Sequence, residues 1–266
     1  MKKLSFLLLS LMAMTLLTAC NGGNEPSSVQ KLTSTINCRA IEGDVVVFSQ
    51  GTANVEVDYT NMVIKFTSPY VDMNGHSSTL STPEMKLKNV SPTTYEFAAS
   101  ASQQMGSSSI ESLGGYIDFA TGMLWYTINT ASCEIVCSSQ ILYAYATTEI
   151  SNPDNDNYGV HQKSAYLFAL DSKGESCTLQ ISNFMSNVNG TVDAPVVEYV
   201  NLTLLPTVIG YEITADEVES NYKGYYKLTD VDFTLDEQCM TINGSFKCNG
   251  LEYEVKGPLF QTKTSN

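Results

Sequence analysis

The stretch VIKFTSPYVDMNG, from Val63 to Gly75, matches TLQISNFMSNVNG, from Thr178 to Gly190, without a gap. Further matches follow in the same order, at an offset that stays near 115 residues. They pair Tyr95–Ala99 with Tyr211–Ala215, Ile117–Phe119 with Val231–Phe233, and Thr127–Asn129 with Thr241–Asn243, and Cys133 falls near Cys248. Solenoid repeats have periods of about 20 to 50 residues, so this longer period indicates duplicated domains. We expect one β domain at residues 31–137 and its copy at 138–266.

Alternation of apolar and polar residues with a period of two dominates the chain. Ala53, Val55 and Val57, for example, would share one face of a strand. Hydrophobic residues make up 43% of the sequence, which is enough for a packed core, whereas charged residues make up 16%. Serine, threonine and asparagine are plentiful, which is typical of short strands joined by polar turns. The sequence therefore predicts an all-β fold of two tandem, internally duplicated antiparallel β-barrel or β-sandwich domains.

Asparagine–glycine pairs mark the expected turns. Asn74-Gly75 and Asn189-Gly190 occupy the same place in the two copies. Asn-Gly tolerates positive φ at both central positions of a hairpin, as a type I′ turn requires. We expect such a turn in each copy.

The C-terminal region allows two arrangements. A hairpin at Asn243-Gly244 would place Cys239 directly opposite Cys248, close enough for a disulfide. Alternatively, one strand runs from Met240 to Cys248 and turns at Asn249-Gly250. We favour the continuous strand, because the hairpin would leave only four residues between two turns, fewer than a usual strand has.

The N-terminal segment has the composition of a secretion signal. Lys2 and Lys3 precede a short apolar run, which is too short to span a bilayer comfortably. The run ends in Leu17-Thr18-Ala19-Cys20, which resembles a bacterial lipobox. The resemblance implies removal of residues 1–19 and lipid attachment to Cys20, with residues 20–30 as a flexible tether. It also implies a membrane partner bound through the lipid.

Because Asn21 follows the cysteine where some Gram-negative lipoproteins carry an inner-membrane retention aspartate, we expect the outer membrane. The periplasmic and the cell-surface side both remain open.

The net charge argues against one class of partner. A formal charge of −14 repels phosphate backbones, so we expect no nucleic-acid partner.

Six cysteines remain after Cys20, and in an exported chain they permit disulfides in 15 full pairings. Buried free thiols are the alternative. No CxxC pair is present, so zinc binding is not indicated.

No catalytic motif is recognisable. The chain has no HExxH, no GxSxG and no glycine-rich phosphate loop. SNPDNDNYG, around Asp154 and Asp156, has the alternating acids of a calcium loop but lacks its third and twelfth ligands, so a turn is the better interpretation. We therefore expect no metal, no cofactor and no enzyme activity.

Aromatic residues give the best indication of binding. Tyr222, Tyr225 and Tyr226 surround Gly224, and exposed tyrosines can stack on sugars or anchor peptides and proteins. The alternative is that Tyr226 points into the core. Trp125 is the only tryptophan, and we expect it to pack in the core.

Two family resemblances complete the sequence-based hypotheses. The lipobox, the polar strands and the repeat resemble the two-repeat β lipoproteins of Bacteroidota, and LQISNF (Leu179–Phe184) is similar to their calycin-like β-barrel members. These resemblances imply a small barrel or sandwich per copy and bring no catalytic residues. The leading hypothesis is a non-enzymatic, envelope-anchored binding module for a glycan, peptide or protein.

Two other functions remain as alternatives. One is a pilus subunit, because fimbrial subunits of Bacteroidota are cleaved at an arginine near the N-terminus and Arg39 lies at such a place. The other is a hydrolase with an unrecognised carboxylate pair.

Overall fold

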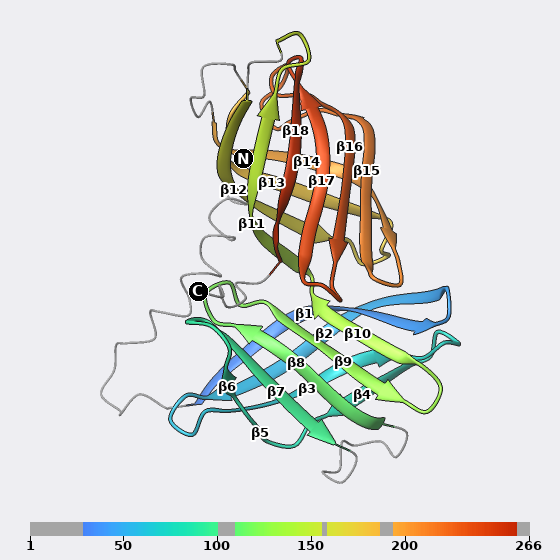
Figure 1. The fold of residues 1–266 in the computed structure, drawn as a ribbon. Coiled ribbons are helices and arrows are strands. Elements are labelled where there is room, and N and C mark those ends of the chain that lie inside the picture. Colours follow the sequence, from blue (N-terminus) through green and yellow to red (C-terminus); the bar gives the residue numbers. More distant parts are fainter. Residues whose placement is uncertain (1–28, 101–109, 156–158, 187–193, 260–266) are drawn as a thin grey trace.

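The computed structural model describes residues 29–100, 110–155, 159–186 and 194–259. These residues form an open ten-stranded antiparallel sheet and a closed eight-stranded antiparallel barrel, so the all-β prediction is confirmed (Figure 1). The expected signal peptide and Cys20 lie outside the described residues. Val29 and Gln30, which the sequence placed in the tether, belong to the first strand. No helix in the described ranges has the length and apolar character needed to cross a membrane.

The sheet contains β1 (Val29–Glu42), β2 (Val45–Asp58), β3 (Val63–Val71), β4 (Ser77–Ser81), β5 (Met85–Lys86), β6 (Lys88–Asn89), β7 (Thr94–Ser100), β8 (Ile110–Asp118), β9 (Leu124–Thr130) and β10 (Glu134–Ser139). The barrel contains β11 (Ile141–Ser151), β12 (Gly159–Leu170), β13 (Ser176–Phe184), β14 (Ala194–Pro206), β15 (Gly210–Val218), β16 (Leu228–Asp236), β17 (Thr241–Cys248) and β18 (Leu251–Pro258).

The sheet and the barrel share one strand order. Strand β1 pairs with β2 and with β10, just as β11 pairs with β12 and with β18. The order β3-β2-β1-β10-β9-β8-β7 in the sheet therefore repeats as β13-β12-β11-β18-β17-β16-β15 in the barrel. This shared order is the structural form of the internal duplication.

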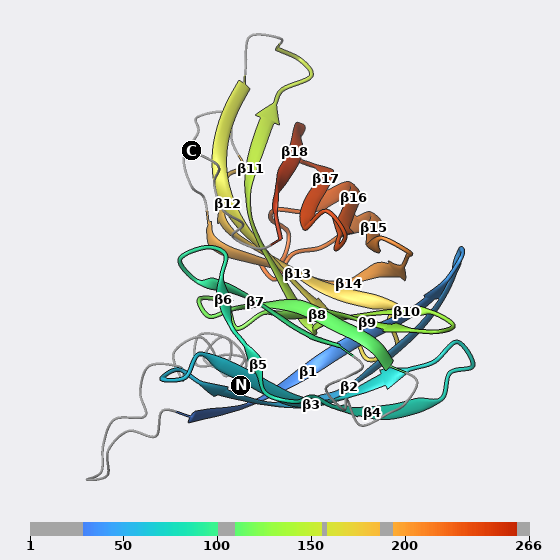
Figure 2. The ribbon, with the colours of Figure 1, turned by 60° about the horizontal axis from the view of Figure 1, so that its bottom comes forward.

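The two copies differ in how they close. In the barrel, the long strand β14 pairs with β13 on one side and β15 on the other. The corresponding stretch of the sheet is broken into β4, β5 and β6, and Pro83 lies in the break. Proline has no N–H to donate to a ladder, so it cannot continue a strand paired on both sides. The sheet curls, but among the described strands only the short β4, β5 and β6 lie along its β3 and β7 edges, and they do not join these edges into a barrel (Figure 2).

The offset between residues matched in the sequence differs from the offset between equivalent turns in the structure. Asp58 and Asp171 cap equivalent turns 113 residues apart, and Asp118 and Asp236 cap equivalent turns 118 residues apart. Both offsets differ by even numbers from those of the sequence matches there, so the buried faces still agree. The two cysteines lie near each other's equivalent place without coinciding, because Cys248 ends β17 whereas Cys133 lies just before β10.

The prediction of a type I′ turn at Asn74-Gly75 is wrong. Gly75 has φ 79°, but Asn74 keeps a negative φ, and residues 72–76 form a longer loop in which the Gly75 N–H donates to the Asp72 carbonyl at 3.0 Å. Asn189-Gly190 lies outside the described residues. A two-residue turn with positive φ at both positions occurs instead at Asn249-Gly250. It ends a continuous β17, which confirms our preference for one strand in this region.

The barrel has a filled interior. Its inward side chains form one apolar cluster in which the buried aromatic residues are at most 2% exposed. These residues are Tyr166, Phe168, Phe184, Tyr199, Tyr211, Phe233, Phe246 and Tyr253. Ring contacts run through this cluster, for example Phe246 to Tyr253 at 4.5 Å between centroids. The barrel is therefore a packed core rather than a ligand-holding cup.

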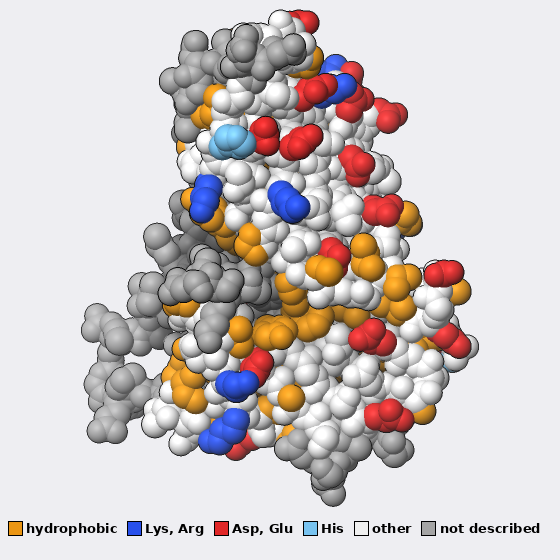
Figure 3. Space-filling model, in the orientation of Figure 1, with side chains coloured by type: hydrophobic (Ala, Val, Ile, Leu, Met, Phe, Trp, Pro, Cys, Tyr) orange, Lys and Arg blue, Asp and Glu red, His pale blue; other side chains and the backbone are white. Residues whose placement is uncertain are grey.

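One end of the barrel rests on the outer face of the sheet. Gln140 is the one residue between β10 and β11, and its side chain donates to the Leu170 carbonyl at 3.0 Å. Phe48 and Trp125 of the sheet pack against the apolar cluster of the barrel. Apolar side chains also gather along this seam on the visible surface (Figure 3).

Candidate binding groove on the barrel

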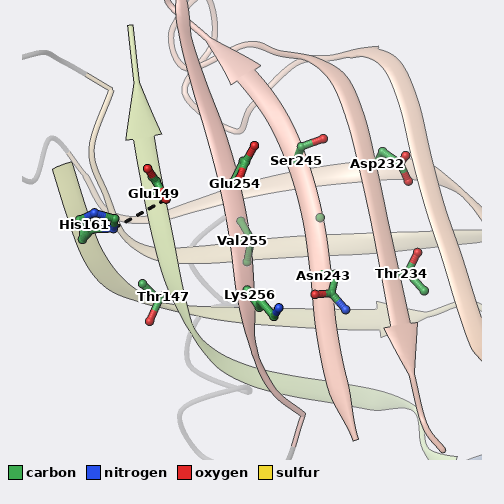
Figure 4. Close-up of a pocket in the computed structure, with 11 residues that line it drawn as sticks. Thr147, Glu149, His161, Asp232, Thr234, Asn243, Ser245, Glu254, Val255 and Lys256 are labelled. Atoms are coloured by element: carbon green, nitrogen blue, oxygen red, sulfur yellow. Dashed lines mark ion pairs between the residues drawn. The ribbon is translucent and has the colours of Figure 1, made fainter. Parts of the chain in front are cut away.

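A shallow groove of about 710 Å³ crosses the outer face of the barrel over β16, β17, β18, β11 and β12 (Figure 4). Its side chains form two rows, because outward residues on paired strands lie side by side. The lysine row consists of Thr234, Asn243, Lys256 and Thr147, each paired in register with the next. The carboxylate row consists of Asp232, Ser245, Glu254, Glu149 and His161, also paired in register.

The alternation of the strands explains why these residues face water. In β17, Ile242 and Phe246 point into the barrel, so Asn243 and Ser245 point outward. Gly244 takes the inward position between them, opposite Phe233. A Cβ on Gly244 would lie 2.2 Å from the Phe233 ring, so only glycine lets this ring pack against the strand.

The carboxylate row concentrates negative charge. Glu149 and Glu254 lie directly opposite each other on neighbouring strands, and like charges in this position lower stability. His161 Nδ1 is 4.0 Å from Glu149 Oε2, and both side chains are more than half exposed. Lys256 supplies the one cation among the residues that line the groove. The groove thus presents carboxylate, amide and hydroxyl groups to a ligand that approaches from the solvent.

The structure places the three predicted tyrosines in the loop between β15 and β16, at the barrel end away from the sheet. Tyr222 and Tyr225 are 39% and 69% exposed, whereas Tyr226 is only partly exposed. The Tyr226 ring contacts both of them, with centroids 5.6 Å from Tyr222 and 6.2 Å from Tyr225. Sequence reasoning therefore found an aromatic cluster that the fold assembles.

Hydrogen bonds hold this loop in place. Ser220 Oγ contacts the carbonyls of Tyr222 and Tyr225, at 3.1 and 2.6 Å, and accepts from the Tyr222 N–H. The Tyr226 ring packs edge-on against Phe184 of the core at 5.6 Å, and its carbonyl accepts from the Tyr199 hydroxyl at 2.8 Å. Tyr226 thus supports the loop from beneath, while Tyr222 and Tyr225 face water.

Arg39 is not accessible to a protease in the folded protein. It lies inside β1, which is paired with β2 and β10 on its two sides at this point, and its side chain is fully buried. A protease needs an extended, accessible segment. This placement argues against cleavage after Arg39 in the folded protein and weakens the pilus alternative.

Sequence reasoning missed the groove. Its residues come from five strands, and none belongs to a motif. The available signal was the outward set of each strand: Asn243 and Ser245, or Glu254 and Lys256, alternate with apolar residues. Which strands lie side by side cannot be known from that alternation alone.

Within the described ranges, no group of three or more potential metal-binding side chains comes together. Asp154 lies in a turn, as we expected from the sequence, and its N–H donates to the Asn152 side chain at 3.0 Å. Asp156 lies outside the described residues.

No family model and no curated protein matches the chain. Among solved structures, it is similar to a crystal structure of a Bacteroides fragilis protein titled a "putative outer membrane protein". The TM-score is 0.34 and the sequence identity 11%, over 85% of this chain and 96% of that chain.

Proposed function

We propose that this protein is a lipid-anchored binding protein of the outer membrane, and that its groove on the barrel binds a polyhydroxylated ligand such as a glycan. The observation that carries the proposal is the pairing of polar residues into two parallel rows across five strands. The filled barrel interior supports the same choice, because a ligand then has to bind outside.

The chemistry of the rows suits hydroxyl groups. Carboxylates such as Glu254 accept hydrogen bonds, the Asn243 amide both donates and accepts, and the serine and threonine hydroxyls do either. Neighbouring strands are about 4.8 Å apart, and successive outward residues on one strand are about 6.8 Å apart. Such a regular array of polar groups favours a ligand whose own hydroxyl groups repeat. The negative carboxylate row disfavours acidic polymers.

A hydrolase remains the second candidate because of one pair. Retaining glycosidases hold two carboxyl groups about 5–5.5 Å apart, and Glu149 faces Glu254 at the spacing of neighbouring strands. However, a catalytic acid is normally shielded from water, whereas Glu149 is 54% exposed. This exposure supports binding over catalysis.

The anchor rests on the lipobox resemblance. Several acyl chains hold a protein firmly at a membrane, whereas one chain holds it only marginally. Replacing Cys20 with serine should release the full chain from the membrane fraction. Unchanged fractionation of C20S would contradict the anchoring part of the proposal.

Glycan arrays probed with the purified protein test the binding part. We expect retention on neutral or amino-sugar glycans, loss of retention for the N243A/S245A double variant, and no change in the mass of the bound glycan. Cleaved products would favour the hydrolase. Loss with Y222A/Y225A instead would move the binding site to the tyrosine loop.

A further inference from the structure

Cys38 and Cys137 face each other in the core of the sheet. They are partners in the register between β1 and β10, and their Sγ atoms are 3.3 Å apart. Both residues are fully buried on the inner face, beside Tyr126, which is the register partner of Cys137 on β9. No motif suggested this pairing, because 99 residues separate the two cysteines in the sequence.

We propose that Cys38 and Cys137 form a disulfide that joins β1 to β10. This inference goes beyond the proposed function and does not depend on the groove. Directly opposed residues of an antiparallel pair have Cα atoms about 4.5–5.5 Å apart, within the range that a disulfide accepts. The sulfur atoms need to approach by about 1.2 Å to reach bonding distance, which small side-chain rotations provide.

The cost of forming the bond is small. In the thiol form, Cys137 donates to the Cys38 sulfur, and Cys38 donates to the Pro69 carbonyl at 3.3 Å. Oxidation removes both S–H groups, but a thiol is a weak donor, so little hydrogen bonding is lost. Ile36, Ala40 and Tyr126 belong to the same buried apolar cluster as the two cysteines, and the loss of two S–H groups leaves none of them without a polar partner.

The oxidant is a disulfide, carried either by a protein or by a small molecule. The thiolate of one cysteine attacks the oxidant disulfide, forms a mixed disulfide and releases one oxidant thiolate. The second cysteine, as thiolate, then attacks the protein sulfur of that mixed disulfide and releases the second oxidant thiolate. Two protein thiols thus become one disulfide, one oxidant disulfide becomes two thiols, and the two protons end on those thiols.

The order of events follows from burial. Burial, reinforced by the neighbouring Cys38, holds the pKa of the Cys137 thiol well above its usual range. Cys137 is therefore a poor nucleophile in the folded chain. Both sulfur atoms are also closed to an oxidant, because both residues are fully buried. Oxidation takes place while the chain folds, before β1 and β10 close over the two sulfurs.

Peptide mapping tests the bond directly. The full chain is unfolded, refolded with oxidised glutathione, alkylated under acid quench and digested with trypsin plus a glutamate-specific protease. Cleavage after Lys31, Arg39, Glu134 and Glu149 isolates Leu32–Arg39, with Cys38, from Ile135–Glu149, with Cys137. We expect these two peptides to be recovered linked, with a mass 2 Da below their sum. Recovery of both as alkylated thiols, or linked to other cysteines, would overturn the proposal.

Thermal unfolding gives a second readout that does not need a variant to fold. A disulfide closing a loop of this length should raise the melting temperature of the oxidised chain by about 10 °C over the reduced chain. The exposed Cys239 provides the matched control: C239S should keep this difference, whereas C38A and C137A should lose it. An identical melting temperature for oxidised and reduced wild-type protein would also overturn the proposal.

Discussion

Arg39 Nη2 lies 2.5 Å from Glu237 Oε2, and the two side chains are 0% and 2% exposed. Arg39 belongs to β1 of the sheet, whereas Glu237 lies in the turn between β16 and β17 of the barrel. The same guanidinium donates to the Thr207 carbonyl and lies 4.9 Å from the centre of the Tyr211 ring. The single arginine of the chain thus joins the two halves through one buried cluster.

Breaking this ion pair should destabilise the protein strongly. R39M leaves the Glu237 carboxylate buried without its cation, and E237L leaves the guanidinium without its anion. Each variant should lose about 3–5 kcal/mol of unfolding free energy in urea titrations. The double variant R39M/E237L should lose much less than the sum, because both desolvated charges disappear together.

The double-variant result has a specific reason. Arg39 Nε and Glu237 Oε1 find no hydrogen-bond partner among the residues that the structure describes, so part of the desolvation cost is not offset in the wild type. K31A, which removes an exposed partner of Glu56, serves as control and should unfold like the wild type. Losses below about 1 kcal/mol for both single variants would show that the pair does not hold the seam.

Gly244 should tolerate no side chain. G244A places a Cβ against the Phe233 ring and the Asp232 carbonyl, which should lower the unfolding free energy by about 1–3 kcal/mol. Gly159 also lies in the barrel, but a Cβ there meets nothing within 4 Å. G159A should therefore unfold at the wild-type urea concentration, and equal effects of the two substitutions would contradict the packing described for β17.

The tyrosine loop should show a division of roles. Y226A removes a ring that packs on Phe184 and should cost about 2–3 kcal/mol of unfolding free energy. Y225A removes a ring that is 69% exposed and should cost less than about 0.5 kcal/mol. Chemical denaturation of the two variants measures both values. A larger loss for Y225A would mean that its ring supports the loop.

Asp171 should make stability depend on pH in the acid range. Burial acts to raise its pKa, but hydrogen bonds from the Glu175 N–H and the Ser176 hydroxyl outweigh it, so the pKa is lowered. Its contribution is therefore present above the ordinary aspartate pKa and is lost as the pH falls through the lower folded value. D171N should lower the melting temperature at pH 7, and this difference from the wild type should shrink as the pH falls below the ordinary aspartate pKa. D154N, at an exposed turn, is the control.

The groove variants should affect binding without affecting the fold. N243A/S245A changes outward side chains, so far-UV circular dichroism and the melting temperature should stay at wild-type values. E254Q should keep the circular dichroism spectrum and raise the melting temperature slightly, because it removes the repulsion from Glu149. Affinity for a glycan found on the array should fall about tenfold or more by titration calorimetry, because each removes hydrogen bonds to the ligand. Substitution of the outward Thr203 on β14 is the matched control, since it lies outside the groove lining.

The sequence was most informative where local rules decide the structure. Period-two alternation predicted the strands, and the shortness of the segment from Ser245 to Cys248 correctly excluded a second hairpin there. The repeat indicated duplication, although the offset between its matched residues differs by two to four residues from the offset between equivalent turns. A shift by an even number of residues keeps the same side chains on the inward face of a strand. Two sequences can therefore match in their burial pattern even when the matched residues are not structurally equivalent.

The rest depends on contacts that distant residues make. Nothing near Arg39 in the sequence indicates Glu237, and nothing near Cys38 indicates Cys137, because strand order brings each pair together. Asn74-Gly75 failed as a type I′ turn because Asp72 accepts the N–H groups of Asn74 and His76 and stabilises a longer loop. A side chain next to the turn thus outweighed the preference of the turn residues themselves.

Trp125 gives the protein an intrinsic fluorescent reporter at the seam. Its ring stacks on Tyr116 at 5.8 Å on the sheet and packs against the apolar cluster of the barrel. Indole emission shifts to longer wavelength when water reaches the ring, and no other tryptophan contributes to the signal. Separation of the barrel from an intact sheet would therefore be seen as a red shift that precedes the loss of β-sheet circular dichroism, so that the order of these two events measures whether the halves come apart before either unfolds.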